Sequence, residues 1–396
     1  METRQNSHLA KRKSNLTKLE QFLYMLVTAS VVSVPSVGGL HKPAAVRSIS
    51  RTTVTRTKTL ATSLLGLTAA ALLALGAGSG ATAAPSISDG TDASTVSSNS
   101  ASDANTADNW TPERMKNAVS GDLLVTKALT RTQAAVGLSD IPTSPDQVFP
   151  GLGRALTIEG QNATSTAAPS PAVDRKANAG ESPVSHIGKV FFTLGGVNYV
   201  CSGNSVTSAN QSTVSTAGHC LNEGPGAFAG NFTFVPAYQD GAAPYGKWTA
   251  KALYTTSQWS SSGNIQYDTG FAVMNTVNGQ KLSAVVGASG VQFNAARGLA
   301  YKSFGYPAAS PFTGESLKSC SGTATNDPNN PQFNTQGIPC NMTGGSSGGP
   351  WFLGSSASGY QNSVNSYGYG SNSTTMYGPY LGTVIQGTYQ TASTAP

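Results

Sequence analysis

The stretch KVFFTLGGVNYVCSGNSVT, residues 189–207, decides the fold class of this chain. Two short runs rich in Val, Phe and Tyr stand on either side of the pair Gly195–Gly196. Aromatic and β-branched residues favour strands, and glycine supplies the positive φ angles that a tight turn requires. The stretch therefore predicts a β-hairpin.

Strand-like runs of the same kind continue toward the C-terminus. They are NFTFVPAY (231–238), KWTAKALY (247–254), TGFAVMNTV (269–277), LAYKSFGY (299–306), PWFLG (350–354) and GPYLGTVIQGTY (378–389). Clusters of Gly, Asn, Pro and Ser separate them, and no long amphipathic helical pattern is visible. Many short strands with frequent turns predict an all-β sandwich or barrel over residues 186–396.

The charge of the chain is unevenly distributed. The net charge is +6, yet residues 1–84 hold ten Lys/Arg and two Asp/Glu, while residues 85–396 hold fourteen Lys/Arg and sixteen Asp/Glu. The N-terminal part therefore carries +8 and the remainder −2. No basic surface is left for phosphates, so we expect no nucleic-acid partner.

The basic segment has the features of a secretory signal peptide. Arg56 and Lys58 precede an apolar stretch from Leu60 to Leu75, and small residues lead to a predicted cleavage site near Ala83–Ala84. A transmembrane helix is disfavoured because the apolar run is short and no basic flank follows it. Residues 1–53 are then an N-terminal extension, either a long basic leader or sequence upstream of a translation start at Val54.

Residues 85–185 are predicted to be a linker and propeptide. Residues 85–109 and 160–182 are rich in Ala, Ser, Thr, Pro and Asn and cannot bury a core. Between them, Thr111 can cap a helix over about 111–128, with Pro112 in its first turn and Trp110 packed against Met115. A small helical segment between linkers behind a signal peptide is typical of a propeptide; an accessory module of the mature protein is the alternative.

The cysteines fit a secreted protein. Cys201, Cys220, Cys320 and Cys340 are even in number, which in an oxidising compartment indicates two disulfides. Their spacing does not resemble that of zinc ligands. Three pairings are possible, and sequential pairing is the most local of them.

The stretch GGSSGGPW, residues 344–351, raises the question of function. Ser347 is either a nucleophile at a sharp turn or part of a flexible Gly-rich loop. A nucleophilic serine needs a base and an acid that orients the base. His219, in STAGHC, is the one histidine after residue 187. The candidate acids after it are Glu223, Asp240, Asp268, Glu315 and Asp327.

Asp268 is the preferred acid. It stands at the entrance to an apolar strand in NIQYDTGFAVM, where its carboxylate could be buried against the imidazole. Asp240 precedes Gly and Asp327 precedes Pro, so both are interpreted as turn residues.

The order His219, Asp268, Ser347 is where a family resemblance appears. STAGHC, YDTGFAVM and GSSGGP resemble the histidine, aspartate and serine motifs of the trypsin/chymotrypsin-like serine peptidases, in a secreted bacterial branch. The resemblance covers about 186–396 and implies two six-stranded antiparallel β-barrels with the triad between them. It also implies that Cys201 bonds to Cys220 across the histidine loop.

The resemblance implies a role for each site residue. His219 is general base and acid, Asp268 orients it, Ser347 attacks the carbonyl, and the backbone amides of Gly345 and Ser347 form the oxyanion hole. The corresponding substrate pocket has Asn341 at its base, and its other expected lining residues are Met342, Ser366, Tyr367 and Gly368.

Two departures from the family pattern affect activation and specificity. Ser346 stands where animal members have an acid that pairs with the new N-terminus, so the propeptide is expected to act as a folding aid or a cleft blocker. Asn341 is neutral and no second histidine follows His219, so uncharged side chains are the expected substrates, with Glu bound through hydroxyl groups as the alternative.

Two other classes of protein share features of this sequence. GSSGG also matches the nucleophile elbow of esterases, but that fold requires a histidine after the serine, and none follows Ser347. A catalytically weak, protease-like binding module is the remaining alternative to the enzyme. The sequence thus predicts a secreted serine endopeptidase made as a precursor, monomeric, without metal, cofactor or stable membrane anchor, that acts on proteins or peptides.

Overall fold

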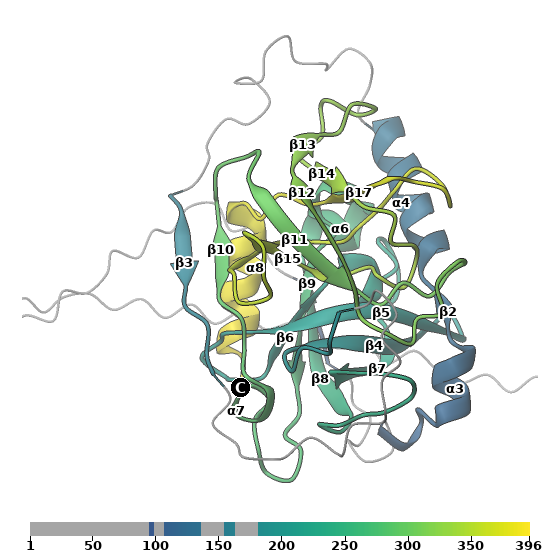
Figure 1. Cartoon of the computed structure of the whole chain (residues 1–396), viewed down its shortest axis with the longest axis vertical. Coiled ribbons are helices and arrows are strands. Elements are labelled where there is room, and N and C mark those ends of the chain that lie inside the picture. Colours follow the sequence, from purple (N-terminus) through teal and green to yellow (C-terminus); the bar gives the residue numbers. More distant parts are fainter. Residues whose placement is uncertain (1–94, 99–106, 136–153, 163–180) are drawn as a thin grey trace, which may run out of the picture. The chain divides into compact units, whose positions relative to one another are not determined.

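The computed structural model describes residues 95–98, 107–135, 154–162 and 181–396, which belong to the unit Ala84–Pro396 (Figure 1). The predicted signal peptide, the N-terminal extension and most of both predicted linkers lie outside the described residues. Among the described residues, no helix combines the length and apolar content needed to cross a membrane.

The hairpin predicted from residues 189–207 is present. Strand β4 (Ile187–Leu194) pairs antiparallel with β5 (Val197–Val206), and Leu194 lies opposite Val197. Gly195 and Gly196, which link the strands, have φ angles of 57° and 79°. Two consecutive positive φ angles suit a two-residue turn, and the turn sets the register of both strands.

The hairpin forms part of a closed barrel. Its other strands are β6 (Thr213–Thr216), β7 (Gly230–Pro236), β8 (Trp248–Thr255) and β9 (Gly270–Met274). The strand order is β8-β7-β4-β5-β6-β9, and pairing of β9 with β8 closes the ring. Alternate side chains from these strands, among them Val190, Phe192, Phe234 and Leu253, fill the interior.

The second half of the protein contains two hydrogen-bonded groups of strands. One has the order β12 (Lys318–Thr323), β11 (Ala300–Gly305), β15 (Pro350–Leu353), β16 (Gln361–Val364), β10 (Val291–Phe293). The other joins β13 (Thr325–Asn326), β14 (Gln336–Pro339) and β17 (Thr375–Gly378). A disulfide between Cys320 of β12 and Cys340, the residue after β14, connects the two groups. Tyr367, three residues beyond β16, forms a bridge to Tyr377 of β17. The all-β prediction is confirmed.

The C-terminal run 378–389, predicted as a strand, is mostly helical. Helix α8 spans Thr383–Thr394 and buries Ile385, Thr388, Tyr389 and Ala392. These positions follow the i, i+3, i+4, i+7 spacing of one helix face. Interleaved Gly and Thr residues weaken the helical pattern in the sequence, so the prediction of no long amphipathic helix was wrong. Four shorter helical elements, α6 (Ser257–Ser262), α7 (Leu282–Val286), η2 (Gly218–Cys220) and η3 (Ile265–Tyr267), connect the strands.

The segment before residue 181 is more structured than predicted. The expected helix over 111–128 is divided into α3 (Pro112–Asn117) and α4 (Asp122–Ala135), because β2 (Val119–Ser120) between them pairs with β5. Thr111 caps α3 as predicted, accepting a hydrogen bond of 3.3 Å from the backbone N–H of Arg114. Trp110 and Met115 are buried in one apolar cluster.

Parts of both predicted linkers also pair with strands. Residues Thr95–Ser98 in the first linker form β1, antiparallel to β8. Leu156–Ile158, just before the second linker, form β3, which lies beside β10 (Figure 1). Gln161 forms a further bridge to Ala288. Composition missed these contacts because backbone groups, which every residue carries, make the pairing.

Candidate active site

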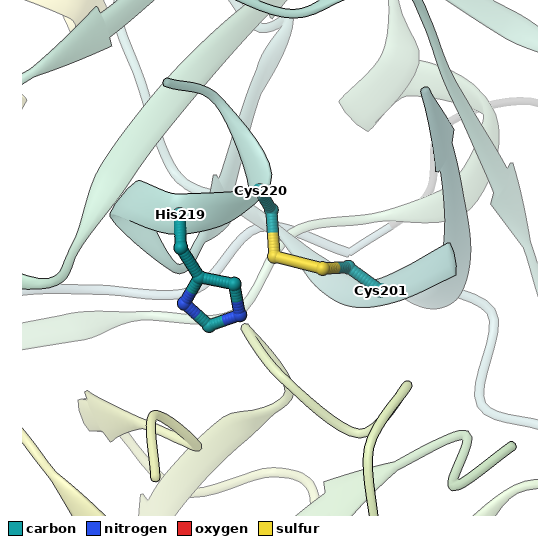
Figure 2. Close-up of side chains that lie close together, drawn as sticks. All are labelled: Cys201, His219 and Cys220. Carbon is teal, nitrogen blue, oxygen red and sulfur yellow. A yellow bond between two sulfur atoms is a disulfide. The ribbon is translucent and has the colours of Figure 1, made fainter. Parts of the chain in front are cut away.

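His219 lies in η2, immediately after β6 of the closed barrel. Figure 2 shows its imidazole beside the disulfide that joins the neighbouring Cys220 to Cys201 of β5. Gly218 allows Trp259 and Asp268 to pack closely against the histidine loop, because a Cβ at this position would lie 2.9 Å from Cγ of Trp259 and 3.0 Å from Oδ1 of Asp268. The disulfide and the glycine together hold the backbone under the histidine.

Asp268 is fully buried between η3 and β9 and accepts three hydrogen bonds. Its Oδ1 accepts from the backbone N–H of His219 at 2.8 Å, and its Oδ2 accepts from Nδ1 of the same residue at 2.8 Å. The hydroxyl of Ser366 donates to Oδ2 at 2.5 Å. A carboxylate only accepts, so Nδ1 carries the proton and Nε2 presents a lone pair. Nε2 is buried and has no hydrogen-bond partner among the described residues.

Ser347 lies in a tightly packed turn rather than a flexible loop. Gly345 and Gly348 have φ angles of 93° and 79°, and a Cβ on Gly348 would lie 2.1 Å from Oγ1 of Thr216. The carbonyl oxygen of Ser347 accepts from the backbone N–H of Ser202 at 2.7 Å and lies 3.9 Å from Sγ of Cys220. The serine backbone is therefore fixed next to the histidine loop.

The two backbone amides predicted for the oxyanion hole stand on the same turn. Within the described ranges, neither Gly345 nor Ser347 donates its N–H to another residue. A Cβ on Gly345 would lie 2.7 Å from Cβ of Ala308 and 2.8 Å from the carbonyl oxygen of Tyr306, so only glycine fits there. Two unpaired N–H groups beside a serine are the arrangement that stabilises a developing oxyanion.

A cavity of about 260 Å³ adjoins Ser347. All five residues predicted for the substrate pocket line it, together with further small polar residues; the predicted five are Asn341, Met342, Ser366, Tyr367 and Gly368. No charged side chain from residues 181–396 lines this cavity. Asp122, Val125 and Thr126 of α4 also line it, which the sequence analysis did not predict.

Asp327, interpreted from the sequence as a turn residue, is a buried carboxylate behind this pocket. Tyr367 donates to its Oδ2 at 2.9 Å, and the hydroxyl of Tyr369 donates to the same atom. Burial and the Asp327 carboxylate together raise the pKa of Tyr367 well above its usual value. Asp327 thereby holds Tyr367, which lines the pocket, in place. Its Oδ1 accepts from the backbone N–H of Asn329 at 2.9 Å, as expected of a turn residue, but the two tyrosines lie about forty residues away in the chain, so no local pattern could have indicated them.

Cys201, His219 and Cys220 are also close enough to suggest a metal site. The donor set does not fit one, because the two sulfurs are bonded to each other (Figure 2). A metal-binding cysteine needs a free thiolate, so the cluster offers a single imidazole.

Two solved protease structures are similar to this chain. The crystal structure of the protease Anisep from Arthrobacter nicotinovorans is 83% identical, with a TM-score of 0.54, over 55% of this chain and 99% of that chain. The thermostable serine protease AL20 from an extremophilic microorganism is 53% identical, with a TM-score of 0.52, over 54% of this chain and 98% of that chain. No family model matches the chain.

One curated protein is similar over a short stretch. The "Extracellular metalloprotease" of Bacillus subtilis (strain 168) is 32% identical over 77 residues, and the chain spans about a quarter of its length (24%).

The fold and the two solved relatives define the class of protein. The chain belongs to the bacterial serine proteases of chymotrypsin-like fold, and it is a serine endopeptidase.

Proposed function

We propose that residues 186–396 are the catalytic domain of a secreted endopeptidase that hydrolyses proteins or peptides through His219, Asp268 and Ser347. The observation that carries the proposal is the buried His219–Asp268 pair, which leaves Nε2 unpaired next to the Ser347 turn. The protease Anisep matches 55% of the chain, a share close to the 211 of 396 residues in this domain. Residues 1–84 are proposed as leader and 85–185 as propeptide.

Each residue has one chemical task in this mechanism. Nε2 of His219 takes the hydroxyl proton of Ser347 as the oxygen attacks the carbonyl, and later gives the proton to the leaving amine. Asp268 holds the tautomer and stabilises the imidazolium. The amides of Gly345 and Ser347 donate to the carbonyl oxygen as it becomes negative. Water then hydrolyses the acyl-enzyme, with His219 again as the base.

Replacing the nucleophile tests the proposal. Ser347→Ala should abolish amide hydrolysis and labelling by an organophosphonate probe without reducing secretion, and His219→Ala should lose nearly as much activity. Triad members act as a unit, so each loss is on the order of a million-fold in rate. Robust hydrolysis by Ser347→Ala would contradict the assignment of Ser347 as the nucleophile. If the unaltered protein bound substrate but did not hydrolyse it, a binding module would be favoured instead.

The pocket favours uncharged side chains before the cleaved bond. Asn341 and Met342 offer no negative charge for Arg or Lys, and an unpaired cation in a closed pocket is unfavourable. Hydroxyl groups of Thr343, Ser373 and Thr375 also line the cavity and keep cleavage after Glu as the competing specificity.

Peptide-library profiling at neutral pH decides between these specificities. We expect cleavage after apolar or small residues. Dominant cleavage after Glu would support the competing specificity, and dominant cleavage after Arg or Lys would show that the cavity is not the primary pocket.

A further inference from the structure

The segment 107–135 passes directly over the proposed catalytic residues. A Cβ on Gly121 would lie 3.4 Å from Cδ2 and 3.8 Å from Nε2 of His219. A Cβ on Gly344, three residues before Ser347, would lie 1.9 Å from Oδ1 of Asp122, so this carboxylate packs directly against the Gly344 backbone. With the segment in place, His219 is 0% and Ser347 is 5% exposed.

The first anchor of the segment lies on the closed barrel. The indole of Trp110 is fully buried, its ring centroid lies 5.3 Å from that of Phe191, and its Nε1 donates to the carbonyl oxygen of Asn231 at 2.7 Å. Nζ of Lys247 donates to the carbonyl oxygen of Trp110, also at 2.7 Å. Met115 of α3 is buried in the same cluster. This anchor therefore combines apolar burial with satisfied polar groups.

The second anchor is helix α4, on the far side of the histidine. Val125, Ala128 and Leu129 are buried in one cluster with aromatic residues of the catalytic region, among them Trp259 and Tyr367. Oγ1 of Thr132 accepts from the backbone N–H of Ile265 at 2.9 Å. Thr126, Lys127 and Thr130, which lie between these buried positions, are exposed. One face of α4 therefore makes the contact with the catalytic region, and the opposite face does not.

The direction of the segment is opposite to that of a substrate. In a peptide the acyl part precedes the cleaved bond, so a substrate enters at the cavity near Tyr367. On the proposed function, the side chain before the cleaved bond occupies this cavity, so we place the leaving amine on the other side of His219, beside the Cys201–Cys220 disulfide, which does not line the cavity. The segment instead passes β5 first, where Val119 lies opposite Tyr199 in parallel pairing, and reaches the cavity only afterwards, at Asp122.

We propose that residues 107–135 are a reverse-bound inhibitor of this site, an intramolecular partner that fills the cleft without being cut. The proposal rests on the proposed function. Because the anchors hold the segment on both sides of His219, chain cleavage on the C-terminal side of residue 135 would leave the segment bound as a separate fragment. The enzyme would become active when the fragment dissociates or is degraded, and dissociation becomes favourable once the covalent tether no longer maintains a high effective concentration.

Labelling of the intact precursor tests the inhibition. The secreted precursor is treated with a fluorophosphonate probe, and only the full-length band is quantified on a gel. Leu129→Asp should label at least about tenfold faster than the unaltered precursor, because burying an unpaired carboxylate in an apolar contact weakens binding by more than a tenfold step. Thr130→Asp, at the adjacent exposed position, should label as slowly as the unaltered precursor.

Two results of this experiment would overturn the inhibitor. One is equal labelling rates for Leu129→Asp and the unaltered precursor; the other is an unaltered precursor that labels as fast as the processed enzyme. Gly121→Leu, which places a side chain against His219, gives a second variant with the same expected increase in case Leu129→Asp is not secreted. Processed enzyme that is not labelled at all would instead contradict the proposed function.

The binding direction has its own test. A peptide of residues 107–135, added to processed enzyme, should raise KM without changing kcat and remain intact by mass spectrometry. The same peptide with Leu129→Asp should inhibit at least about tenfold less, for the reason given for the precursor. Cleavage at either bond of Gly121 would show that the segment binds as a substrate does, and absence of inhibition would contradict the proposal.

Discussion

At the scale of single residues, the environment of Asp268 shows how this site is held in place. The carboxylate is removed from water, yet each oxygen is paired, with His219 on both and Ser366 on one. A buried carboxylate is tolerable only when hydrogen bonds replace its hydration. Ser366, predicted as a pocket residue, therefore also contacts the proposed triad through Asp268.

We expect Ser366→Ala to lower kcat by about tenfold or more with little change in KM. A hydrogen bond to a charged group contributes about 1.5–3 kcal/mol, and loss of this one leaves Asp268 less able to stabilise the imidazolium. Steady-state kinetics on a chromogenic peptide measure the effect. Ser371→Ala, which alters the same cavity without touching Asp268, is the matched control. A change in KM alone would assign Ser366 to substrate binding only.

At the scale of elements, the histidine loop is the short helix η2, which follows β6 and is fixed by the Cys201–Cys220 disulfide. Cys201 and Cys220 are 19 positions apart, and the bond ties η2 to β5. The opposite half has its own bond between β12 and the end of β14, 20 positions apart. Each half of the fold thus contains one disulfide-closed loop, and the two loops are similar in length.

Removing Cys201 and Cys220 together as alanines should lower the free energy of unfolding of the processed enzyme by about 3 kcal/mol. The Cys320/Cys340 double variant should lose a similar amount of stability but retain more kcat, because its ring does not contain the histidine. Urea unfolding and peptide kinetics compare the two variants. Non-reducing peptide mapping that joined Cys201 to Cys320 or Cys340 would refute the pairing.

The elements also show what the sequence could and could not predict. The hairpin of β4 and β5 was predictable because its turn and its strands are encoded within one short stretch. The close approach of the His219 and Ser347 loops was predictable because each lies in a local motif with glycine that tight packing requires, and their catalytic roles stay predictions. Helix α8 was not, since its buried face at Ile385 and Tyr389 becomes apparent only against the strands it covers. Asp327 was missed for the same reason, as distant tyrosines define its role.

At the scale of the whole molecule, the turn that carries Ser347 does not depend on a new N-terminus. Ser346 is buried, its hydroxyl donates to the carbonyl oxygen of Thr343 at 2.8 Å, and its N–H donates to the same atom at 3.2 Å. A hydroxyl that is already paired and uncharged cannot hold an ammonium as an acid would. The turn is therefore formed while the N-terminal segment is still attached.

Adding one residue to the mature N-terminus should consequently leave kcat and KM of the processed enzyme within about twofold, as is usual for a surface change remote from the site. The mature terminus is first located by mass spectrometry of the secreted protein. A variant with one added alanine is then compared with the unaltered enzyme by kinetics and circular dichroism. Loss of activity in a folded protein would mean that the new terminus pairs within the active site.

Strands β1 and β3 cover two sheet edges, and this cover affects how readily the protein associates with copies of itself. β1 pairs with Ala252–Thr255 of β8, and β3 pairs with Val291–Phe293 of β10. Removal of the residues before 181 would turn both stretches into open sheet edges with unpaired backbone donors and acceptors. Such edges accept a strand from another molecule. The precursor would then remain dispersed at concentrations where the processed enzyme self-associates, so maturation would change solubility as well as catalysis.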